Sequence, residues 1–150
     1  MAETRDDLRA EYAILQTNYE AIDGRIISMK GWLVPLLSAG LGLGIRDQSI
    51  GLLLATGLAC LCVWVLEGIW KNFQWCYSDR IRLLEGVFRG EADSSTIAPF
   101  QVHSSWGRKY TEYQAGAKLW QTMKRPFVCI PYLPVLAACI AAVIWVLLTP

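Results

Sequence analysis

The chain has 150 residues, of which 54% are hydrophobic and 18% are charged, and its formal net charge is +1. This composition, gathered into three apolar runs, indicates an integral membrane protein and leaves little chain for a separate soluble domain. A zinc, haem or redox centre is not expected, because there is one histidine and none of the five cysteines forms a CxxC pair.

Residues 1–30 are predicted to form an amphipathic helix in the cytoplasm. Apolar side chains recur there at alternating spacings of four and three residues, which is a heptad pattern. The members of this heptad stripe are Leu8, Tyr12, Leu15, Tyr19, Ile22, Ile26 and Met29. Two interpretations stay open, since the stripe can pack against a later helix of the same chain or form a coiled coil between subunits.

Residues 31–70 are predicted to form a transmembrane hairpin of two spans joined by the short loop RDQS. The first span carries a small-residue surface made of Ser38, Gly40, Gly42 and Gly44. Small residues let two helices approach closely in a membrane. This surface is a candidate either for packing of the two spans or for a pore wall or oligomer interface.

The second span is predicted to continue without a break into a long cytoplasmic helix, over Ile50–Arg89. Its first half fits the ~20 residues needed to cross a bilayer, and Glu67 is the one ionisable residue in that half. Intramembrane acids are candidate functional residues by default. We interpret Glu67 as pairing with Lys71 near the interface; the alternative is that it faces a polar lumen or binds Lys30 or Arg25 across the hairpin.

Residues 71–125 are predicted to form a helical cytoplasmic connector. In its first part, Asp79, Arg80, Arg82 and Glu85 are interpreted as a solvated face or as a contact with the N-terminal helix. Its stretch Ser104–Met123 mixes aromatic and basic residues, which is typical of a helix at the headgroup interface; packing on Lys71–Arg89 is the alternative. The candidate contacts with the membrane surface or a partner are Trp106, Arg108, Lys109, Tyr110, Tyr113 and Trp120. Bases beside an anionic leaflet need no nucleic acid to explain them, so none is expected as a partner.

Residues 126–150 supply a third predicted span, with Pro131 and Pro134 expected to bend or loosen its first third. Of the 14 lysines and arginines, Arg46 alone lies in the loop between the first two spans. The positive-inside rule therefore predicts a cytoplasmic N-terminus and connector, and a C-terminus on the other side of the membrane. The predicted fold class is an all-α integral membrane protein with three transmembrane helices and cytoplasmic amphipathic helices.

Enzyme chemistry is not expected. The sequence has no phosphate-binding glycine-rich loop, no paired-histidine spacing and no GxSxG motif. His103 is interpreted as a polar loop residue. No catalytic residue, cofactor or metal ligand is therefore predicted.

The order of a helix ending in YEAIDGRIISMKGW, a tight two-span hairpin and the aromatic segment WVLEGIWKNFQWCYSDRIRLLE resembles a recurrent type of small bacterial membrane protein. More loosely, Tyr12–Leu84 resembles the SLATT-type effectors of bacterial conflict systems. That resemblance implies a homo-oligomeric, pore-forming effector that perturbs the lipid bilayer in antiphage defence. The alternative is a membrane-anchored scaffold whose helical connector docks a cytoplasmic protein partner.

Overall fold

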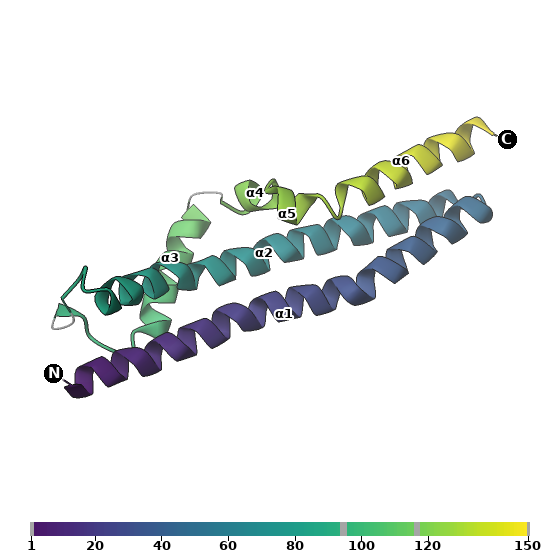
Figure 1. The fold of residues 1–150 in the computed structure, drawn as a ribbon. Helices are drawn as coiled ribbons and strands as arrows, with labels where there is room; N and C mark the ends of the chain where they lie inside the picture. Colours follow the sequence, from purple (N-terminus) through teal and green to yellow (C-terminus); the bar gives the residue numbers. More distant parts are fainter. Residues whose placement is uncertain (1, 94–95, 116–117, 150) are drawn as a thin grey trace. The chain divides into compact units, whose positions relative to one another are not determined.

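A computed structural model of the chain describes residues 2–93, 96–115 and 118–149. These residues form helices and turns with no strand, which confirms the all-helical class (Figure 1). The helices are α1 (Ala2–Arg46), α2 (Ile50–Phe88), α3 (Val102–Ala115), α4 (Lys118–Met123), α5 (Pro126–Cys129) and α6 (Leu133–Leu148).

The two longest helices are α1 and α2. The predicted N-terminal helix and first span form one helix, because α1 continues through Pro35. The predicted continuity after Ile50 is confirmed, since α2 runs to Phe88 in one piece. Within the described residues these two helices are long and apolar enough to cross a membrane.

The turn between α1 and α2 follows from local backbone chemistry. Gln48 adopts a φ of 49°, in the left-handed region. The amide of Ser49 donates a hydrogen bond to the carbonyl of Gly44 at 2.9 Å, and the amide of Gln48 donates one to the carbonyl of Ile45 at 3.3 Å. This pair of bonds is a Schellman motif, which satisfies the last carbonyls of a helix. The Ser49 hydroxyl then accepts from the Leu52 amide at 3.3 Å and caps α2.

Residue contacts divide the chain into two compact units, each assembled from separate stretches of sequence. Unit 1 comprises Met1–Arg25 and Trp70–Leu119, and unit 2 comprises Ile26–Ile69 and Trp120–Pro150. Both α1 and α2 therefore contribute residues to each unit.

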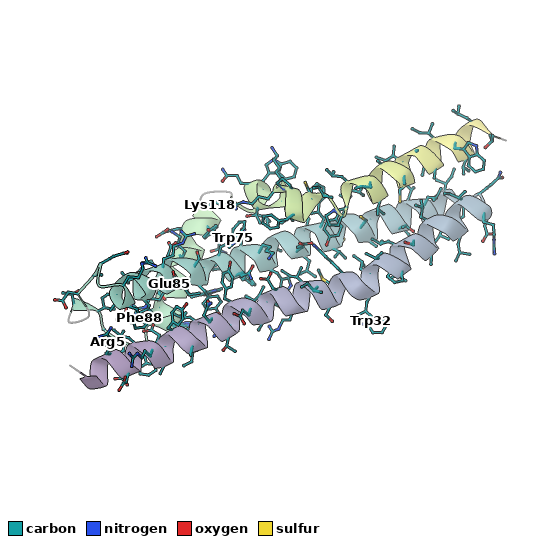
Figure 2. The ribbon with its side chains drawn as sticks, viewed as in Figure 1. Arg5, Trp32, Trp75, Glu85, Phe88 and Lys118 are labelled. Atoms are coloured by element: carbon teal, nitrogen blue, oxygen red, sulfur yellow. The ribbon has the colours of Figure 1, made fainter. Side chains whose placement is uncertain are left out.

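The core of unit 1 contains the first four residues of the heptad stripe of α1, from Leu8 to Tyr19. Buried Leu8 and Leu15 pack with three buried side chains of α2, Ile81, Leu84 and Val87. Tyr12 and Phe88 meet edge to face with ring centroids 5.7 Å apart, and Figure 2 shows Phe88 on the side of α2 that faces α1. This part of the stripe thus packs within the chain, which is the first of its two interpretations.

The third apolar segment is broken near its start. Helix α5 ends at Cys129, α6 begins at Leu133, and Pro131 lies between them. The predicted effect of the prolines is therefore confirmed. Helix α6 has 16 residues and rises about 24 Å, which is shorter than a hydrocarbon core of about 30 Å.

Candidate functional site

Glu67 lies on α2 in unit 2 and is only 1% exposed. Its Oε1 accepts a hydrogen bond from Nζ of Lys30 on α1 at 2.7 Å, and its Oε2 accepts from the hydroxyl of Tyr132 at 2.6 Å. The interpretation that Glu67 pairs with Lys71 is replaced by the alternative, binding to Lys30 across the hairpin. We call Glu67, Lys30 and Tyr132 the Glu67 cluster.

Aromatic side chains pack beside the Glu67 cluster. Tyr132 is buried, and its ring stacks on Trp64 at a centroid distance of 6.4 Å. Trp64 in turn donates its Nε1 hydrogen to the carbonyl of Met123 at 3.1 Å. A buried charge must be paired and fully hydrogen-bonded to be tolerated. The cluster meets that requirement by joining α1, α2 and the segment before α6.

The small-residue surface of α1 divides into two faces. A Cβ atom at Gly40 would lie 2.4 Å from Oγ1 of Thr56, and one at Gly44 would lie 2.6 Å from Cδ2 of Leu53. These two glycines therefore pack directly against α2 inside unit 2. Ser38 and Gly42 are exposed, so they stay candidates for contacts with another chain.

Three of the candidate contact residues on α3 are used inside unit 1. Trp106 donates its Nε1 hydrogen to the carbonyl of Phe73 at 3.1 Å and stacks on Tyr110 at 5.0 Å. Lys109 pairs with Asp79 at 2.6 Å. The hydrogen bond to Asp79 raises the pKa of Lys109 above its usual range. Helix α3 therefore packs on α2, which is the alternative interpretation of this stretch.

The other candidate contact residues lie nearer the surface. Arg108 is exposed, and Tyr113 is half-buried below the ammonium of Lys118, which lies 4.7 Å from its ring centroid. Trp120, in unit 2, is 56% exposed. A role for these residues at the membrane surface or in partner binding stays a prediction. His103 is exposed on α3 rather than in a loop.

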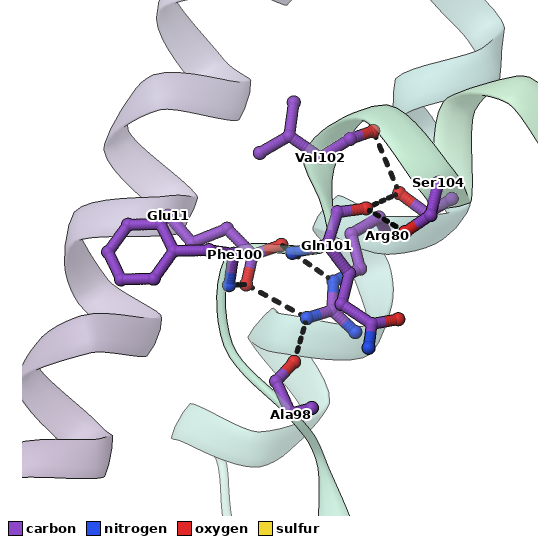
Figure 3. Close-up of polar contacts among 8 residues, drawn as sticks. Glu11, Arg80, Ala98, Phe100, Gln101, Val102 and Ser104 are labelled. Carbon is purple, nitrogen blue, oxygen red and sulfur yellow. Dashed lines mark hydrogen bonds and ion pairs between the residues drawn. The ribbon is translucent and has the colours of Figure 1, made fainter.

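A buried acid that the sequence patterns did not single out lies in unit 1. Glu11 of α1 is 0% exposed and binds Arg80 through two hydrogen bonds, Nε to Oε1 at 3.0 Å and Nη2 to Oε2 at 2.8 Å. The amides of Phe100 and Gln101 each donate to this carboxylate at 3.0 Å (Figure 3). Arg80 also donates to the carbonyl of Ala98 at 2.8 Å. We call these five residues the Glu11 clamp.

The clamp fixes the segment before α3 to both long helices. A sequence signal for it exists, because Glu11 lies three residues after Leu8 and four before Leu15 and so shares their buried face. Two of the four charged residues predicted as a solvated face or a contact with the N-terminal helix take part. Arg80 binds Glu11, and Glu85 accepts a hydrogen bond from the Tyr12 hydroxyl at 3.2 Å. For these two residues the contact with the N-terminal helix is confirmed.

Lys71 belongs to a separate polar group in unit 1. Its Nζ binds Oδ1 of Asp23, and Gln74 donates to Oδ2 of the same carboxylate at 2.7 Å. Burial acts to raise the pKa of Asp23, but the hydrogen bonds from Lys71 and Gln74 bring it below its ordinary value. Asp23 therefore stays ionised at neutral pH.

Among the described residues, no three His, Cys, Asp or Glu side chains lie together as a metal ion would need. Cys60, Cys76 and Cys139 are buried packing residues, and burial raises the pKa of the Cys76 thiol to about 11. Comparisons with protein-family models, curated proteins and solved structures found no match. The function is therefore inferred from the geometry and chemistry of these groups.

Proposed function

We propose that this chain is a multi-pass protein of the bacterial inner membrane. The most apolar windows of α1 and α2 are only 11% and 22% buried, whereas a core helix of a soluble protein would be mostly buried. Trp32 projects away from α1 and is 82% exposed (Figure 2). Monomeric soluble proteins rarely expose large apolar surfaces, and hydrocarbon would cover this one.

The proposed topology has three spans. The distribution of lysine and arginine supports a cytoplasmic location for residues 1–30 and 71–125 and an outer location for the C-terminus. Because α6 alone is short, the third crossing would use α5 and the residues up to Tyr132 as well.

Within this topology we infer an oligomeric, channel-like effector that perturbs the membrane. The Glu67 cluster is the observation that carries the proposal, since a buried ionisable group at the cytoplasmic end of a span is costly and is a candidate functional site. The cluster would stabilise a closed state by binding the segment before α6 to the hairpin. Three spans are too few to enclose a water-filled pore, so the proposal requires a homo-oligomer, with Ser38 and Gly42 at its interface. Antiphage defence is the role that the resemblance to SLATT-type effectors supports.

Replacing Glu67 with glutamine is expected to increase ion leak. The change removes the charge that holds Lys30, and loss of one member of a buried pair costs about 3–5 kcal/mol, enough to raise the open population more than tenfold. Leak is measured as dye release or conductance of the purified protein in liposomes. The matched control is Asp47→Asn, which breaks only the exposed pair with Arg46 in the turn.

Native mass spectrometry supplies the second half of this test. A closed assembly of four or more chains, together with the increased leak of Glu67→Gln, would support the proposal. A monomer or dimer whose leak is the same with and without Glu67 would overturn it.

A second candidate function, a membrane-anchored scaffold for a cytoplasmic protein partner, is favoured by Phe100. This residue has a φ of 56° and its side chain is 57% exposed. A positive φ is strained for a bulky residue, at a cost of about 1–3 kcal/mol. The Glu11 clamp maintains that strain, and the result is an aromatic ring presented to solvent.

The scaffold function predicts that Phe100→Ser loses a partner that the wild-type chain retains. An aromatic anchor at the centre of an interface contributes 2 kcal/mol or more, so co-purification should fall by about thirtyfold. Ile14→Ser, at another exposed apolar position in unit 1, is the control and should retain the partner. Equal recovery with both variants would exclude Phe100 as the docking residue.

A further inference from the structure

An apolar groove of about 350 Å³ lies between α2 and α6 in unit 2. Its walls run from Leu53 to Leu61 on α2 and from Leu136 to Ile144 on α6, and every lining side chain is apolar. Each wall is eight residue steps long, which is about 12 Å of helix. Near the middle, Gly57 opens the groove, because it has no side chain facing Cys139.

One end of the groove is followed by basic and aromatic residues. One turn beyond Leu61, Trp64 donates to the carbonyl of Met123, and Lys124 and Arg125 come directly after Met123 in the chain. The Lys124 ammonium lies 4.9 Å from the ring centroid of the exposed Trp120. A tryptophan beside basic residues is the usual composition at the headgroup level of a membrane.

We propose that this groove binds one anionic phospholipid of the cytoplasmic leaflet. An acyl chain lies along the apolar walls, and the phosphate lies against Lys124 and Arg125. This inference rests on the membrane location proposed above, which brings that end of the groove to the anionic leaflet. Basic pockets between transmembrane helices on this side bind anionic headgroups in other membrane proteins.

The charge beside the groove favours an anionic lipid over a helix of a second copy. The groove walls are apolar and about 12 Å long, which suits a flexible acyl chain. The positive charge of Lys124 and Arg125, which follow Met123 in the chain, complements a phosphate.

Native mass spectrometry of the full chain in detergent, titrated with phosphatidylglycerol or with phosphatidylcholine of the same acyl chains, tests the site. We expect one retained phosphatidylglycerol per chain, bound about tenfold more tightly than phosphatidylcholine. The double variant Lys124→Gln and Arg125→Gln should lose this preference. Gly57→Leu should fill the groove and weaken the binding of both lipids, while Ala55→Leu, exposed on α2 outside the groove, should bind as the wild type does.

If Gly57→Leu fails to fold, Ile140→Trp fills the groove from α6 at an exposed position. Equal binding of the two lipids by the wild type would overturn the proposal, as would unchanged binding by a folded groove-filling variant. Flotation with vesicles separates this result from the membrane location. A chain that floats but shows no lipid preference lacks the site and is still a membrane protein, whereas a chain that does not float overturns both proposals.

Discussion

Arg80→Leu is expected to destabilise unit 1 by about 3–5 kcal/mol, a large fraction of the 5–15 kcal/mol that typically stabilises a domain. The variant leaves the carboxylate of Glu11 in a fully buried position with only the amides of Phe100 and Gln101 as donors. It also removes the donor to the carbonyl of Ala98. The measurement is alkylation of Cys76, which is buried and has a pKa of about 11. In the wild type this thiol should react only after denaturation, and in Arg80→Leu it should react under native conditions.

Two further variants define what the clamp contributes. Arg89→Leu breaks an exposed pair with Glu91 and should leave Cys76 protected, because exposed ion pairs stabilise little. Replacing both Glu11 and Arg80 with leucine should not restore stability, since the amides of Phe100 and Gln101 then lose their acceptor. Cys76 labelling of Arg80→Leu at the wild-type rate would show that the clamp does not stabilise unit 1.

Gly40→Ala and Gly42→Ala are expected to change the stability of unit 2 in opposite directions. At Gly40 the new Cβ would lie 2.4 Å from Oγ1 of Thr56. Thr56 cannot turn away without losing its hydrogen bond to the carbonyl of Leu52 at 2.8 Å. Overpacking of this kind costs about 1–3 kcal/mol. At Gly42 the new Cβ meets nothing within 4 Å, and alanine favours a helix by up to about 1 kcal/mol over glycine.

Thermal unfolding of the two variants in a detergent that keeps the chain monomeric measures this difference. We expect a lower Tm than wild type for Gly40→Ala and an equal or higher one for Gly42→Ala. Equal melting temperatures for the two variants would mean that α1 and α2 do not pack through Gly40. A lower Tm for Gly42→Ala alone would assign the close contact to the exposed face instead.

The helical class, the two long apolar helices, the break near Pro131 and the buried heptad stripe could all be predicted from the sequence. Each depends on composition, on the local effect of a proline or on a period of three to four residues, which nearby residues encode by themselves. The union of residues 1–30 and the first span in the single helix α1, which includes Pro35, was not predicted. Proline disfavours a helix locally, and the rest of the α1 sequence outweighs that preference.

The partners of the buried charged groups required the tertiary structure. Glu11 and Arg80 are 69 residues apart in the chain, and Glu67 and Tyr132 are 65 apart, so no local period connects them. The same applies to the faces of the small-residue surface, because only the packing of α2 distinguishes Gly40 from Gly42. Local spacing determined which residues share a helix face. The tertiary structure decided which helix face is buried and which charged groups pair. Distant segments come together there, and each buried polar group needs a hydrogen-bond partner.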